Sequence, residues 1–207
     1  MGIAAIDSYP IPGSDDLPEN TVPWRVDPTR SALLIHDMQR YFLDPFGEWK
    51  QSVIERVAVL RKNCEAAGIP VIFSVQPAHQ DRAERGLLFD FWGSGPDARV
   101  DIPTELDHSG AAVVVKRRYS AFHRTGLLDL LAEQRRDQIL VCGVYAHIGC
   151  LATIIDAFMN DIQAFAVADA MADFSLRHHM TALEHVATRC GVVTTVDDVR
   201  QALEQQE

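Results

Sequence analysis

The stretch SALLIH, residues 31–36, is apolar at consecutive positions and runs directly into Asp37. Similar short runs recur along the chain with helical patterns between them: IPVIFSV (69–75), AAVVVK (111–116), DQILVCG (137–143), AFAVAD (164–169) and GVVTT (191–195). Strands that are apolar at consecutive positions need cover on both faces, which is typical of a parallel sheet between helix layers. The sequence therefore predicts an α/β fold, a three-layer doubly wound sandwich with a mainly parallel sheet.

The rest of the chain fits around these strands as one domain over residues 1–207, because this length suits a single core. Residues 1–30 hold five prolines, which prevent long helices and indicate an extended arm on the surface. Segment 76–110 is too long for an ordinary connection, so it is interpreted either as a lid over a substrate or as a surface insertion. The expected helices lie near residues 48–67, 127–134, 148–160, 175–190 and 196–205.

Composition excludes several classes of partner. A net charge of −10 and the lack of a sustained basic stripe argue against nucleic acid and acidic membranes, although a small anionic substrate remains possible. No apolar run reaches the roughly 18 residues that cross a bilayer, and no signal peptide pattern is seen, so we expect a cytoplasmic protein. The cysteines form no CxxC pairs and are expected to be free thiols: Cys64, Cys142, Cys150 and Cys190.

Three strand ends carry unusual residues. In open parallel sheets, ligands bind beyond the carboxyl ends of the strands. Asp37 follows the first strand, Lys116 ends the AVVVK strand, and ILVCG opens into a helix start at residues 144–149. A carboxylate, an ammonium group and backbone N–H groups together offer a proton carrier, a cation and an anion cradle. The simpler alternatives are that Asp37 caps a turn and that Lys116 extends its amine to solvent.

Four longer motifs resemble the isochorismatase family: HDMQRYF (36–42), KRRYSAFH (116–123), GVYAHIGC (143–150) and VADAMADFS (167–175). The resemblance covers nearly the whole chain and extends to Gln76-Pro77 and to RGLLFDFWG (85–93). It implies the isochorismatase-like hydrolase fold, a dimer or larger homo-oligomer, and no metal or organic cofactor. The implied substrate is a small chorismate-derived anion, isochorismate or 2-amino-2-deoxyisochorismate, whose enolpyruvyl vinyl ether is cleaved to release pyruvate.

The same resemblance implies a set of site residues. Asp37 would be the general acid that protonates the vinyl ether, with Lys116 as its catalytic partner. The substrate's carboxylates and ring oxygen would be bound by Gln76, Arg85, Tyr145 and the backbone N–H of Gly149, although an arginine in a polar loop is often only solvated. Phe42 and Trp92 are interpreted as apolar walls, with ordinary core packing as the alternative. The resemblance also implies a cis peptide bond between Val144 and Tyr145.

A cysteine amidase of the nicotinamidase type is the main rival interpretation, because such enzymes share this fold. Their nucleophile occupies the position that is Gly149 here, and Cys150 lies one residue later, about 100° around a helix. Their Asp-x-His metal pattern is replaced by Gln76-Pro77-Ala78-His79. Without a nucleophile, acid-catalysed addition of water is the favoured reaction. A non-catalytic binding member of a biosynthetic assembly is the other alternative.

Two further expectations concern departures from the family and the histidines. Arg117 replaces a tryptophan that the family usually has after the catalytic lysine, so a changed preference among ring substituents is expected. No carrier domain is expected in cis, because no phosphopantetheine-attachment pattern precedes the end at residue 207. The histidines are interpreted as structural, with no third ligand evident for a metal: His36, His147, His178 and His179.

Overall fold

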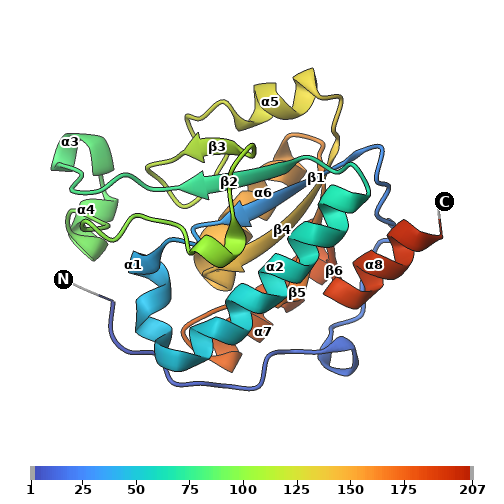
Figure 1. Cartoon of the computed structure of the whole chain (residues 1–207), viewed down its shortest axis with the longest axis horizontal. Helices are drawn as coiled ribbons and strands as arrows, with labels where there is room; N and C mark the ends of the chain where they lie inside the picture. The colour runs from blue at the N-terminus through green and yellow to red at the C-terminus, as the bar shows by residue number, and fades with distance from the viewer. Residues whose placement is uncertain (1–2, 206–207) are drawn as a thin grey trace.

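The computed structural model describes residues 3–205, and within them six strands form one sheet in the order β3-β2-β1-β4-β5-β6 (Figure 1). Every neighbouring pair is parallel, which confirms the predicted doubly wound α/β fold. The central strands are apolar because helices cover them on both sides. The strands are β1 (Ser31–His36), β2 (Val71–Val75), β3 (Ala112–Val115), β4 (Gln138–Val144), β5 (Gln163–Ala172) and β6 (Val192–Thr194).

Helices form the two outer layers. Helices α2 and α8 pack on one face of the sheet through one apolar cluster, and α5, α6 and α7 pack on the other through a second cluster (Figure 1). The helices are α1 (Arg40–Leu43), α2 (Lys50–Ala66), α5 (Leu127–Glu133), α6 (Leu151–Met159), α7 (Leu176–His185) and α8 (Val196–Glu204). Three shorter helical turns join them: η2 (Asp44–Trp49), and the π-helical turns η4 (Ala146–Cys150) and η5 (Val186–Cys190).

Strand β3 departs from the prediction that every apolar strand is covered on both faces. Val113 and Val115 are 48% and 49% exposed. The reason is position: β3 lies at the edge of the sheet and pairs with β2 alone. Val114 faces the core, and Ala112 is partly buried against the same apolar cluster.

The long segment after β2 is not an irregular loop. It contains α3 (Arg82–Arg85), α4 (Leu88–Trp92) and the 3-10 turn η3 (Thr104–Leu106). Asp81 begins α3, because its side chain accepts the N–H of Glu84. Helices α3 and α4 lie beside the carboxyl ends of β2 and β3, at the left of Figure 1. The lid interpretation thus has a structural basis, since the segment lies where ligands bind in parallel sheets.

The predicted N-terminal arm covers residues 1–30, of which residues 1 and 2 lie outside the described residues; from residue 3 onward it contains no long helix and no strand, only the short turn η1 (Ser14–Asp16). It does more than lie on the surface, because Ile6 and Val26 are 8% and 5% exposed and belong to the core. The N–H of Ile6 donates to the carbonyl of Pro45 at 2.8 Å. Within residues 3–205, no helix combines the length and the apolar character needed to cross a membrane.

Candidate active site

A pocket of about 490 Å³, including its open mouth, lies at the carboxyl ends of the central strands. All eight residues predicted from the sequence line it: Asp37, Phe42, Gln76, Arg85, Trp92, Lys116, Tyr145 and Gly149. The structure therefore brings together residues that are more than a hundred positions apart in the chain.

Asp37 and Lys116 form a buried ion pair. Lys116 Nζ lies 2.8 Å from Asp37 Oδ2, and the two residues are 1% and 4% exposed. Strand β2 separates β1 from β3, so the backbones that carry the two groups are about 10 Å apart, and only a long side chain spans that gap. The interpretation of Lys116 as a residue that extends to solvent is wrong. Asp37 has a φ of 49°, a conformation that aspartate tolerates better than most residues.

Gln76 links this pair to Arg85. Arg85 Nη1 donates to Gln76 Oε1 at 3.1 Å, and Gln76 Nε2 donates to Asp37 Oδ2 at 2.8 Å. A guanidinium group can only donate, so it fixes the amide oxygen of Gln76 toward Arg85 and the NH₂ toward Asp37. Gln39 holds the backbone of Gln76 in place with hydrogen bonds to its N–H and its carbonyl. Sequence reasoning had not identified Gln39.

Arg85 is a buried cation without a carboxylate partner among residues 3–205. It is 3% exposed, and its Nε–H has no hydrogen-bond acceptor within the described chain. Burial lowers the pKa of Arg85, although the guanidinium remains charged at neutral pH. A buried charge of this kind is costly unless an anion reaches it. The pocket is therefore suited to a ligand that brings a carboxylate to Arg85.

Aromatic rings form much of the remaining wall. The hydroxyl of Tyr145 donates to the carbonyl of Phe42 at 2.7 Å, and burial raises the pKa of Tyr145. Trp92 Nε1 donates to Tyr119 Oη at 2.9 Å. Sequence reasoning had not singled out seven other lining residues: Ile3, Tyr41, Leu88, Tyr119, Val144, Ile148 and Phe174. Most of these lie inside the quoted motifs, but a motif does not show which of its side chains face a ligand.

Comparison with known proteins shows that residues 31–198 match the isochorismatase domain. The chain belongs to the isochorismatase family. It is 46% identical over 211 residues to the isochorismatase of Bacillus subtilis (strain 168), which covers 99% of this chain and 68% of that protein. It is 45% identical over 203 residues to the phenazine biosynthesis protein PhzD of Pseudomonas fluorescens, covering 96% of this chain and 98% of that protein.

The fold is shared with solved structures in this family and beyond. A cysteine hydrolase from Pseudomonas syringae pv. phaseolicola 1448A superposes with a TM-score of 0.82 at 25% identity, covering 97% of this chain and all of that one. The isochorismatase family thus shares its fold with cysteine-dependent enzymes. Residues at the site, and not the fold, decide between the two chemistries.

A family member of the amidase type would need a cysteine nucleophile in the pocket, and Cys150 does not supply one. Cys150 is fully buried and does not line the pocket. Burial raises the pKa of its thiol well above the usual value, which disfavours a reactive thiolate. All four cysteines are free and buried, as predicted. The cis peptide bond implied by the family resemblance is present between Val144 and Tyr145.

The side chain of Arg117 lies outside the pocket, although its position in the family pattern suggested an influence on substrate preference. Its side chain is exposed, lies 3.4 Å from Glu84 of α3 and does not line the pocket. The expected change in preference among ring substituents stays a prediction, and the pocket gives Arg117 no direct part in it. Tyr119 is the aromatic residue of this segment that lines the pocket.

The histidines fall into two groups. His36 and His179 are fully buried, and burial lowers the pKa of each to about 4, so both are neutral at pH 7. His178 is exposed while His179 is buried, which confirms that these neighbours point to different sides of their helix. The sequence analysis found no third ligand near His147. In the structure, His147 and His178 lie together with Asp173.

Proposed function

We propose that this chain hydrolyses the enolpyruvyl vinyl ether of isochorismate or 2-amino-2-deoxyisochorismate, releasing pyruvate and the ring alcohol. One observation carries the proposal: the Asp37–Lys116 pair lies in the same pocket as the uncompensated guanidinium of Arg85. The proposed substrates match both groups of the pocket. Their vinyl ether bond is cleaved by acid, and their carboxylates can pair with a guanidinium group. Its relatives, an isochorismatase and PhzD, support the same assignment.

Asp37 is the proposed proton donor. Its Oδ2 already accepts hydrogen bonds from Gln76 Nε2 and Lys116 Nζ, both at 2.8 Å. Its Oδ1 has a weaker partner, the hydroxyl of Ser74 at 3.5 Å. The transferable proton therefore belongs on Oδ1. A bound dianionic substrate favours proton uptake by this carboxylate, because like charges repel at short range.

The reaction proceeds by hydration of the double bond. Transfer of the proton from Asp37 to the terminal methylene carbon makes a methyl group and leaves an oxocarbenium ion at the neighbouring carbon. Water adds there and returns one proton to Asp37, which gives a hemiketal. Collapse of the hemiketal breaks the bond between the hemiketal carbon and the ether oxygen that joins it to the ring. The hydroxyl proton moves to this departing oxygen. Lys116 keeps the resulting carboxylate of Asp37 paired throughout.

The other predicted residues bind and orient the substrate in this proposal. Arg85 pairs with a carboxylate through its Nε–H and a terminal N–H, which suits its planar fork. Gln76, Tyr145 and the backbone N–H of Gly149 contact the remaining oxygens. Phe42 and Trp92 border the ring and exclude water.

The deciding experiment is a coupled lactate dehydrogenase assay for pyruvate with each of the two substrates. We expect wild-type turnover and a loss of about 100-fold or more in kcat for Asp37→Asn. Asp169→Asn is the matched control, since Asp169 is also 4% exposed but lies outside the pocket. No pyruvate from either substrate contradicts the proposal. Turnover of amides that is lost in Cys150→Ala supports the amidase instead, and no turnover of either class supports a binding role.

We also propose that the enzyme is a homodimer or larger homo-oligomer. The exposed valines of β3 support this, because an uncovered apolar edge strand is prone to pairing with another chain. Sedimentation velocity of wild type and Val113→Lys tests it. A monomeric wild type contradicts the proposal, and an unchanged oligomer in the variant contradicts the role of β3.

A further inference from the structure

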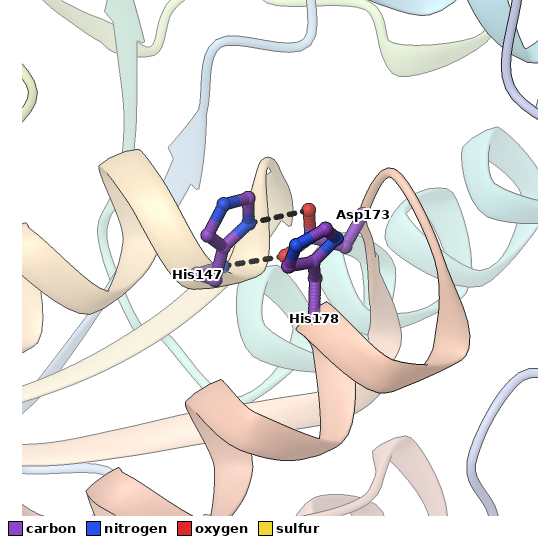
Figure 2. A group of neighbouring side chains, drawn as sticks. All are labelled: His147, Asp173 and His178. Carbon is purple, nitrogen blue, oxygen red and sulfur yellow. Dashed lines mark hydrogen bonds and ion pairs between the residues drawn. The ribbon is translucent and has the colours of Figure 1, made fainter.

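Three side chains outside the pocket meet at one point, although they come from different segments. His147 lies in the turn η4, Asp173 follows β5, and His178 lies in the first turn of α7 (Figure 2). One ligand atom from each lies within 4.8 Å of the others. Two imidazoles and a carboxylate are a donor set that Zn²⁺ and similar divalent metals bind in proteins.

Asp173 is the fixed member of this trio. Its side chain is fully buried, and its Oδ2 accepts the backbone N–H of His147 at 2.6 Å. Its Oδ1 accepts the N–H of Phe174 at 2.7 Å and lies 2.6 Å from His147 Nδ1. These contacts hold the carboxylate rigidly against the imidazole of His147 (Figure 2). The charge and its position are set before any ligand arrives.

His178 is the adjustable member. Its imidazole is exposed and stacks on that of His147, with ring centroids 4.4 Å apart and an angle of 18° between the planes. Its Nδ1 lies 3.0 Å from Ser175 Oγ. The hydrogen bonds described for residues 3–205 engage Nδ1 of His178 and leave its Nε2 available, whereas Nδ1 of His147 faces Asp173 and is the nitrogen that can share a metal with that carboxylate. Rotation of an exposed side chain in the first turn of a helix costs little packing.

We propose that His147, Asp173 and His178 form a site for a divalent transition metal of the Zn²⁺ type. Ligands about 2.1 Å from a tetrahedral metal lie about 3.4 Å from one another, so the trio must contract by roughly 1.4 Å at its widest. Because His147 Nδ1 and Asp173 Oδ1 are only 2.6 Å apart, the wide separations involve His178, and rotation of its ring supplies that change. The metal replaces the proton shared by His147 and Asp173, which is released to solvent. The start of α7 carries a partial positive charge that opposes a cation, and the carboxylate of Asp173 offsets it. Three protein ligands leave a fourth position for solvent.

This site is separate from the reacting groups. Phe174, the residue after Asp173, lines the pocket, whereas the histidines do not. The rings of His147 and His178 lie 5.6 Å and 6.3 Å from the Phe174 ring. A bound metal thus stands behind one wall of the pocket and does not contact Asp37 or Lys116. Its binding is measurable independently of pyruvate release.

The test is calorimetric titration of untagged, chelator-stripped protein with ZnCl₂, together with the visible absorption of Co²⁺ in the same protein. We expect one metal per chain, the intense visible bands of four-coordinate cobalt, and at least a roughly tenfold weaker Kd in His178→Ala. His185→Ala is the matched control, because His185 is exposed two turns along the same helix. His147→Ala should also lose the site.

Three outcomes overturn the proposal: no binding by wild type, binding that is unchanged in His178→Ala, or equal losses in His178→Ala and His185→Ala. The trio would then be a hydrogen-bonded cap for η4 only. Circular dichroism of each variant checks that the fold is retained, which is expected for His178→Ala because the side chain is exposed. The metal-free His178→Ala enzyme should keep wild-type pyruvate release.

Discussion

The imidazole of His36 fills the space that a side chain at position 149 would need. A Cβ added to Gly149 would lie 2.2 Å from His36 Cε1 and 2.9 Å from Nε2. The ring has little room to move, because it is fully buried and its two nitrogens lie 3.0 Å and 3.2 Å from the carbonyl oxygens of Val144 and Tyr119, one of which accepts the single N–H of the neutral imidazole. The structure therefore has no room for a nucleophilic cysteine at position 149, where the family resemblance would place the nucleophile of an amidase.

Gly149→Ala should consequently destabilise the protein and reduce turnover. We expect the free energy of unfolding to fall by about 1–3 kcal/mol, because the added methyl group overpacks a buried ring. Urea denaturation measures this, and pyruvate release reports the effect on the pocket. Gly126→Ala serves as the control, since a Cβ there meets nothing within 4 Å. Equal stability of the two variants would show that His36 moves aside.

Arg85→Lys tests carboxylate recognition in the pocket. Lysine keeps the charge but loses the planar fork and the bond that orients Gln76, so kcat/KM should fall by about 10- to 100-fold. Steady-state pyruvate release with both candidate substrates measures this. Arg117→Lys, on the exposed surface, should leave kcat/KM and the ranking of the substrates unchanged. A large change of kcat/KM in Arg117→Lys, without one in Arg85→Lys, would show that a residue outside the pocket recognises the substrate ring.

Iodoacetamide should leave activity intact. All four thiols are buried, and the raised pKa of Cys150 keeps its thiol protonated. Cys150→Ala should retain kcat while losing about 1 kcal/mol of stability from the deleted sulfur atom. Inactivation that substrate prevents, and that disappears in Cys150→Ala, would restore the amidase interpretation.

Stability should decrease as pH falls below neutrality, in part through His179. Burial lowers the pKa of His179 to about 4 in the folded protein, against 6.5 for an ordinary histidine. Between these values the unfolded chain binds more protons, so the free energy of unfolding falls as pH drops from 7 to 4, by roughly 3 kcal/mol for this group. Urea denaturation across this range should show a shallower pH dependence in His179→Gln than in wild type. The exposed His123→Gln should keep the wild-type slope, and parallel slopes for all three proteins would contradict this assignment.

Much of the fold was predictable because burial leaves a local signature in the sequence. Consecutive apolar residues in β1, β4 and β5 reflect cover on both faces, and alternation with helical patterns implies parallel pairing. Strand β3 has the same signature but lies at the edge, where Val113 and Val115 are exposed. The position of a strand in the sheet depends on how all the strands pair. The sequence of a single strand does not contain this information.

The residue types of the site could be read from the chain, because ligand-binding groups lie at the carboxyl ends of parallel strands and Asp37, Gln76 and Lys116 stand at such ends. Three relationships became visible only in the folded molecule: the 2.8 Å pair across the end of β2, the exposure of Arg117, and the approach of His178 to Asp173. They could not be predicted because a sequence pattern reports the average environment of each residue along the chain. Side-chain directions and distances between remote segments are set by packing.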